Sequence, residues 1–150
     1  GQEVKKLSEV SSEITYQIPS HLSNKFNANH RIMAVSGKGV NHNSFGVLGP
    51  KIGTLYTRVT DNAKPYSYKY QDRVFPDVIF FLIGANDYSH PIRPEPQKFV
   101  KGYKDMLHLV LKELLIIVPE KRPLMIAVGS DEISKEMSKN IRTAVREFGY

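Results

Sequence analysis

One continuous apolar run constrains the fold of this chain more than any other feature of its sequence. The run is Asp77–Ile83 (DVIFFLI), and it lies between Pro76 and Gly84. Its hydrophobicity does not alternate, which is typical of a strand in a parallel sheet that helices cover on both faces. Arg31–Val35 and Pro123–Val128 are shorter runs of the same kind. The sequence therefore predicts three buried parallel strands.

Helical spacing fills the intervals between these runs. Apolar side chains recur at i, i+3 and i+4 over Phe99–Leu114 and again over Ile133–Phe148, where Ser130 is the expected N-cap. A further helix is expected across Ser12–Phe26, with a kink at Pro19. Helices that alternate with strands predict an α/β sheet with right-handed crossovers.

Composition excludes several classes of protein. The length of 150 residues and a hydrophobic content of 41% suit one globular domain across residues 1–150. Because the chain has no cysteine, it has no disulfide scaffold, thiolate zinc site or cysteine nucleophile, and its five histidines show no metal-ligand spacing. No segment reaches the ~18 apolar residues of a membrane span. The start shows neither an initiator Met nor a signal core, which suggests a processed product or a piece of a longer chain and leaves the localisation open.

Charge and glycine patterns argue against nucleotide and nucleic-acid ligands. Lys and Arg number 21 against 15 Asp and Glu, a net charge of +6 that permits an acidic partner without requiring one. The basic residues are spread without a block of like charge, which favours a solvated surface over a nucleic-acid interface. Gly37-x-Gly39 lacks the third glycine of a dinucleotide loop, since His42 stands there, and Lys38 lacks the spacing of a phosphate loop. We therefore expect no nucleic-acid partner, and both nucleotide interpretations of this turn are weak.

Two of the predicted strands end in polar segments, Ser36–Gly39 and Gly84–Asp87. Ligands of open α/β sheets bind at the carboxyl ends of the strands, so these segments are candidates for a site. A glycine N–H and the Asn86 amide aimed into one crevice would form an oxyanion hole for acyl transfer. The spacing alone also fits simple turn glycines and an Asx turn, and it favours that interpretation.

A family resemblance covers these segments. Phe75–Ser89 (FPDVIFFLIGANDYS) resembles the third conserved block of the SGNH/GDSL hydrolases, a hydrophobic strand that ends in Gly-x-Asn-Asp. Ala34–Val40 (AVSGKGV) is similar to the second block, whose glycine supplies an oxyanion N–H. The helix start Phe99–Lys104 (FVKGYK) makes the likeness greatest to acetyl esterases of the carbohydrate esterase family 2 type. The resemblance spans roughly residues 12–130.

The resemblance implies a three-layer α/β/α flavodoxin-like fold, incomplete at both ends, and a serine ester hydrolase that needs no metal or cofactor. Gly37 and Asn86 match the oxyanion-hole positions, and Asp87 matches a position that supports the loop. The implied substrate is a small ester, including acylated carbohydrate. Relatives of this type are often secreted.

Two blocks of the family pattern are absent. No Gly-Asp-Ser motif supplies a nucleophile and no Asp-x-x-His motif supplies a base, so both would lie outside this chain. Ser36, Ser44 and Ser89 lie near the predicted crevice, but none has the sequence context of a nucleophile, even with His42 or His90 as a neighbour.

The missing blocks leave an alternative function open, a catalytically inactive SGNH-fold subunit that binds other proteins or helps to assemble a complex. The aromatic residues of the loop Leu55–Tyr70 would give such a subunit a contact surface or a sugar platform, although ordinary loop packing is the favoured explanation for them. These residues are Tyr56, Tyr66, Tyr68 and Tyr70. A third interpretation, a nucleotide- or nucleic-acid-binding domain, rests only on net charge and the Gly-x-Gly turn.

Overall fold

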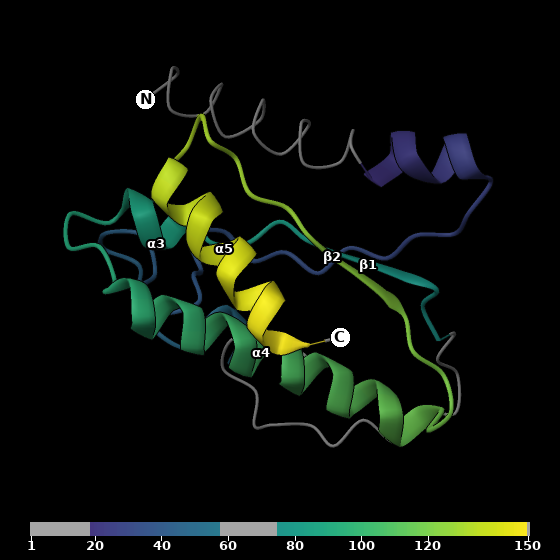
Figure 1. The fold of residues 1–150 in the computed structure, drawn as a ribbon. Coiled ribbons are helices and arrows are strands. Elements are labelled where there is room, and N and C mark those ends of the chain that lie inside the picture. The colour runs from purple at the N-terminus through teal and green to yellow at the C-terminus, as the bar shows by residue number, and fades with distance from the viewer. Residues whose placement is uncertain (1–18, 58–74, 150) are drawn as a thin grey trace. The chain divides into compact units, whose positions relative to one another are not determined.

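The computed structural model describes residues 19–57 and 75–149, and the chain divides into two units, Gly1–Ala34 and Val35–Tyr150. In the first unit, residues 19–26 are helical (Figure 1). Asn27 ends this helix in a left-handed conformation (φ 47°), and the N–H of Ala28 donates to the Ser23 carbonyl at 2.8 Å. Both features are typical of a helix C-terminus. The predicted helix is thus confirmed for residues 19–26, and residues 12–18 lie outside the described residues.

The prediction of a strand at Arg31–Val35 is wrong, because this segment has no regular secondary structure. The side chains of Ile32, Met33 and Val35 are exposed. A strand is stabilised by ladder hydrogen bonds to a neighbour, and among the described residues no strand pairs with this segment. An apolar run in the sequence shows that a segment could be buried as a strand, but it does not show that a neighbouring strand is present to pair with it.

The second unit contains the sheet. In chain order its elements are α2 (Ile52–Tyr56), β1 (Val78–Phe81), α3 (Ala85–Ser89), α4 (Pro96–Ile117), β2 (Leu124–Ala127) and α5 (Lys135–Phe148). β1 and β2 pair in parallel, from Val78 opposite Leu124 to Phe81 opposite Ala127 (Figure 1). Two predicted strands, their parallel pairing and the α/β class are confirmed.

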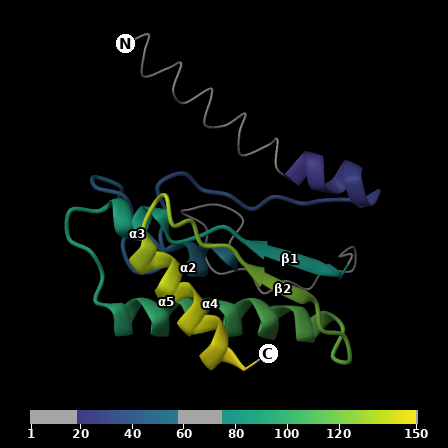
Figure 2. The same ribbon diagram turned by 45° about the horizontal axis from the view of Figure 1, so that its top comes forward.

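The helices α4 and α5 lie on one side of this sheet (Figure 2), where they enclose the core. The stripe predicted on α4 is buried from Phe99 to Leu114 except at Leu111, which is half-buried, and Phe81 contributes from β1. The other sheet face is apolar and exposed among the described residues of this unit. Its exposed side chains are Val78, Phe80, Leu82, Leu124 and Val128.

Helix α5 begins later than its sequence suggests. The predicted N-cap at Ser130 is wrong, because the cap is Ser134, whose hydroxyl accepts the Met137 N–H at 3.2 Å. Ile133 therefore lies before the helix, exposed to solvent. Both positions are serines, and only Ser134 lies three residues before a helical N–H that needs an acceptor. Gly149, in the left-handed conformation at φ 69°, follows the last helical residue.

Candidate functional site

The polar segment after β1 forms α3, a five-residue helix that carries Asn86 and Asp87 in its first turn. Gly84 precedes it with φ 124°, a conformation that favours glycine. A Cβ at this glycine would also meet Phe99 and Met137 at 3.2 Å. The strand therefore turns sharply into α3 and brings both polar side chains against the loop of residues 36–49.

Asp87 holds this loop through its carboxylate. The side chain is fully buried, and three successive backbone N–H groups donate to it, those of Val40 at 2.8 Å, Asn41 at 2.6 Å and His42 at 2.8 Å. Successive N–H groups that converge in this way form an anion-binding nest. Gly39 makes the approach possible, because a Cβ there would overlap the His42 carbonyl oxygen and lie 2.6 Å from Asp87 Oδ2. The loop-supporting role that the resemblance implies for Asp87 agrees with this geometry.

Asn86 connects two points of the same loop through its side-chain amide. Its Nδ2 donates to the Lys38 carbonyl at 2.8 Å, and its Oδ1 accepts the Ser44 hydroxyl at 2.7 Å. The N–H of Ser44 in turn donates to the Gly37 carbonyl at 2.8 Å. We call Gly37, Lys38, Ser44, Asn86 and Asp87 the polar cluster. The structure thus brings Gly37 and Asn86, the two predicted oxyanion donors, into one hydrogen-bonded assembly.

Gly37 has a backbone that favours glycine, with φ 74° and a Cβ position 2.8 Å from Val47 Cγ2. Its carbonyl accepts from Ser44, whereas its N–H donates to no described residue. The Asn86 amide nitrogen carries two hydrogens, of which one reaches Lys38. Each of the two residues therefore has one N–H that no described residue accepts.

The sequence does not predict the contacts that Lys38, Asn43 and Ser44 make in this loop. Lys38 is buried, and its ammonium donates to the Leu48 carbonyl at 2.7 Å. Asn43 accepts from the Gly39 N–H at 3.3 Å and donates to the Gly49 carbonyl at 3.1 Å. A signal existed in the polar run Asn41–Ser44, which follows the Gly-x-Gly turn after Val40. These contacts fix the loop conformation on which the position of Gly37 depends.

In the described part of the chain, Ser44 of the cluster forms no hydrogen bond with the nearby histidines His42 and His90. Ser44 directs its proton to the Asn86 amide oxygen and not to an imidazole. His42 Nδ1 and His90 Nδ1 each lie 2.9 Å from the Ile92 carbonyl oxygen. The two rings lie 5.3 Å apart. This geometry gives Ser44 no general base.

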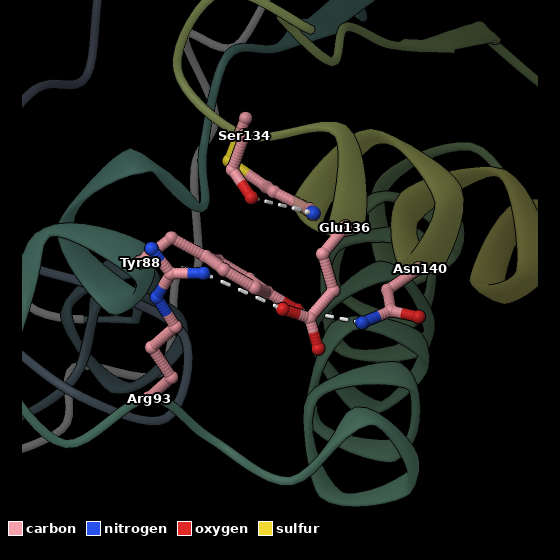
Figure 3. A network of polar contacts seen from close by, with 6 residues as sticks. Tyr88, Arg93, Ser134, Glu136 and Asn140 are labelled. Carbon is pink, nitrogen blue, oxygen red and sulfur yellow. Dashed lines mark hydrogen bonds and ion pairs between the residues drawn. The ribbon is translucent and has the colours of Figure 1, made fainter.

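A second polar network joins α3 to α5 (Figure 3). Buried Asn140 donates to the Tyr88 hydroxyl at 2.7 Å, and Arg93 lies 3.6 Å from Glu136. Burial raises the pKa of Tyr88 above its ordinary value, and the hydrogen bond from Asn140 opposes that shift. The Tyr88 ring packs edge-on against Phe99 at 5.1 Å. Tyr88 therefore fixes α3, and with it Asn86, against the helical layer.

Other predicted features are placed as follows. Tyr56 packs against the core, whereas Tyr66, Tyr68 and Tyr70 lie outside the described residues. Within residues 19–57 and 75–149, no group of three or more His, Asp or Glu side chains is arranged to hold a metal ion. None of the described helices is long and apolar enough to cross a membrane.

Comparison with known proteins gives no relative for this chain. No protein-family model, curated protein or solved structure matches it. The likeness to the SGNH/GDSL hydrolases therefore stays a prediction from the sequence of Ala34–Val40, Phe75–Ser89 and Phe99–Lys104.

Proposed function

We propose that this chain is the central part of an SGNH-type serine ester hydrolase that removes acetyl or other acyl groups from carbohydrate or small esters. One observation carries the proposal. Gly37 and Asn86, from segments that follow different apolar runs, are linked through Ser44 and Lys38 into one cluster, and each retains an N–H that a described residue does not occupy.

The proposed chemistry is a double displacement through an acyl-enzyme. The nucleophilic serine and its histidine base belong to sequence outside these 150 residues. Gly37 and Asn86 donate to the oxygen of the tetrahedral intermediate, where negative charge develops. Each such donor typically lowers the barrier by about 2.7–4 kcal/mol.

The proposed fold is the three-layer flavodoxin-like one. Two observations support it. β1 and β2 are both edge strands among the described residues, so each has a side on which a further strand can pair. The exposed apolar face of the sheet is also the face that a second helical layer would cover.

The test uses the natural polypeptide that carries these residues. Asn86→Ala should lower kcat for p-nitrophenyl acetate about 10²–10³-fold with little change in KM, because the contact forms mainly in the transition state. Asn24→Ala, an exposed asparagine of the first unit, is the matched control and should leave kcat unchanged. A fluorophosphonate should label a serine outside residues 1–150. An undiminished kcat of Asn86→Ala, or a labelled serine within the chain, contradicts the proposal.

A second candidate is the inactive binding or assembly subunit, which one observation favours. Phe45, Leu48 and Ile92 are 77%, 87% and 71% exposed on the loops beside the polar cluster. Exposed apolar side chains that gather near one site are typical of a contact surface. If the natural protein shows no fluorophosphonate labelling and co-purifies with a stoichiometric partner that Phe45→Ser releases, this candidate replaces the hydrolase.

A further inference from the structure

Asn86 is fixed at its backbone, but its side-chain amide has a freedom that the backbone does not restrict. Asn86 lies in α3 next to Asp87, whose carboxylate accepts three backbone N–H groups from the loop. The terminal torsion of an asparagine is broad and roughly two-fold, so a half-turn of the amide exchanges Oδ1 and Nδ2. Only Nδ2 carries hydrogens. The role proposed for Asn86 therefore depends on which of these two atoms faces each partner.

The Lys38 carbonyl and the Ser44 hydroxyl together select one orientation of this amide. A backbone carbonyl only accepts, so the atom 2.8 Å from the Lys38 oxygen is Nδ2 of Asn86. Oδ1 then lies 2.7 Å from Ser44 Oγ, and because Oδ1 also only accepts, the serine hydroxyl donates. The reversed amide would bring Oδ1 against the Lys38 carbonyl, two acceptors with no hydrogen between them.

Ser44 is held in place by its own backbone and not by its side chain. Its N–H donates to the Gly37 carbonyl at 2.8 Å, and its carbonyl accepts the Val47 N–H at 2.9 Å. Both contacts are independent of the side chain at position 44. The hydroxyl is therefore presented to Asn86 from a fixed Cα, through the single torsion of a serine side chain. The main chain of Ser44 contacts Gly37, and its side chain contacts Asn86.

We propose that Ser44 is a positioning residue that orients the Asn86 amide for the ester hydrolysis proposed above, and this inference rests on that function. Ser44 acts through Asn86 and not on the substrate. Its hydroxyl holds Oδ1, which leaves Nδ2 as the atom that donates. A donor on Oδ1 also polarises the amide and strengthens the N–H groups at its other end, because linked hydrogen bonds reinforce one another.

The activity test uses the natural polypeptide that carries these residues, with p-nitrophenyl acetate as substrate. Ser44→Ala removes the hydroxyl and keeps both backbone contacts of this residue. It should lower kcat about three- to tenfold with little change in KM, the loss expected of one neutral hydrogen bond that acts in the transition state. The effect should be smaller than that of Asn86→Ala, because the Lys38 carbonyl still favours the correct orientation.

Ser89→Ala is the matched control. The Ser89 hydroxyl also donates to Asn86, at 3.2 Å, but to its backbone carbonyl and from an exposed position. Its removal leaves the amide contacts intact, so kcat should change by less than about twofold. The two variants thus remove one serine hydroxyl each from the same asparagine, and only one of them contacts the amide.

Nuclear magnetic resonance of the protein with ¹⁵N-labelled asparagine measures the orientation without activity. The side-chain amide signals of Asn86 are assigned by their loss in Asn86→Ala. In Ser44→Ala these signals should shift and exchange their hydrogens with water faster, whereas in Ser89→Ala they should not. Backbone amide signals of Gly37 and Val47, from a uniformly labelled sample, should stay in place in both variants. This pattern separates a turned amide from a displaced loop.

Two outcomes overturn the inference. One is a set of Asn86 side-chain signals that Ser44→Ala leaves unaltered. The other is a wild-type kcat in Ser44→Ala when Asn86→Ala is impaired. Failure of the proposed function is a different result, an undiminished kcat of Asn86→Ala, and the Asn86 amide signals in Ser44→Ala then still decide whether Ser44 orients this side chain.

Discussion

The polar cluster and the helical layer of the second unit are held together in different ways. In the cluster, Asp87 and Asn86 are bound by five hydrogen bonds of 2.6–2.8 Å to the loop of residues 36–49. In the helical layer, the core of α4 and α5 is apolar, and the buried Tyr103 hydroxyl and Ser138 hydroxyl have no described partner. Directional contacts define one region and buried apolar area defines the other. Small polar changes should therefore be costly in the first and tolerated in the second.

The largest effect is expected from Asp87→Ala. Three backbone donors lose their shared acceptor, at roughly 1–3 kcal/mol for each buried group, and water relieves part of the loss. We expect the free energy of unfolding to fall by about 3–5 kcal/mol, measured by urea denaturation. Asp105→Ala, which removes an exposed carboxylate paired with Lys101, should cost less than about 1 kcal/mol. Similar losses for the two variants would mean that the nest does not hold the loop.

Gly37→Ala should have a smaller effect on stability. Alanine would have to adopt φ 74° and its Cβ would press on Val47, a contact that a shift of this partly buried side chain can relieve in part. The expected loss in the free energy of unfolding is about 1–3 kcal/mol. Gly46→Ala is the matched control, because Gly46 also has positive φ (79°) but open space around its Cβ. The difference between the two measures the steric contribution, and equal losses would assign the whole effect to backbone conformation.

The sequence predicts the helical layer better than it predicts the polar cluster. The spacing of apolar residues on α4 predicts its buried stripe, and the continuous apolar runs predict β1 and β2, because one local pattern in the sequence indicates each of these elements. The predicted start of α5 lies four residues too early, because Ser130 and Ser134 are both serines that can cap a helix and the sequence does not distinguish them. The prediction of a strand at Arg31–Val35 is wrong because hydrophobicity does not specify a pairing partner.

In the cluster, motif likeness points to Gly37 and Asn86 but not to Ser44 or Lys38. These two side chains bind an amide oxygen and a backbone carbonyl whose directions depend on the folded loop. No periodicity in the sequence reports such directions. The polar residues of a loop can therefore be predicted as a group, whereas their individual partners need the structure.

The smallest effect at neutral pH is expected from Tyr103→Phe, which tests the helical layer. The Tyr103 hydroxyl is fully buried without a described partner, so its removal leaves no group newly unsatisfied. We expect the free energy of unfolding at pH 7 to change by less than about 1 kcal/mol, or to rise. A polar change at Asp87 and one at Tyr103 should thus differ several-fold in cost, as the comparison of the two regions requires.

The same variant has a larger effect in alkali. Burial raises the pKa of Tyr103 above its ordinary value of 10.0, so the folded chain keeps a proton that the unfolded chain releases. The stability of the wild-type chain is then fully present below pH 10 and falls as the pH rises further, by up to about 1.4 kcal/mol per pH unit for each such group. Tyr103→Phe should make this decline shallower in urea denaturation above pH 10, and Tyr88, whose pKa is also raised, should account for part of what remains. Ser138→Ala removes the other buried hydroxyl that has no described partner, and this hydroxyl does not titrate. The stability of this variant should therefore fall with pH as the stability of the wild type does. If Tyr103→Phe and Ser138→Ala lose stability equally in alkali, the buried hydroxyl of Tyr103 does not control the decline of stability above pH 10.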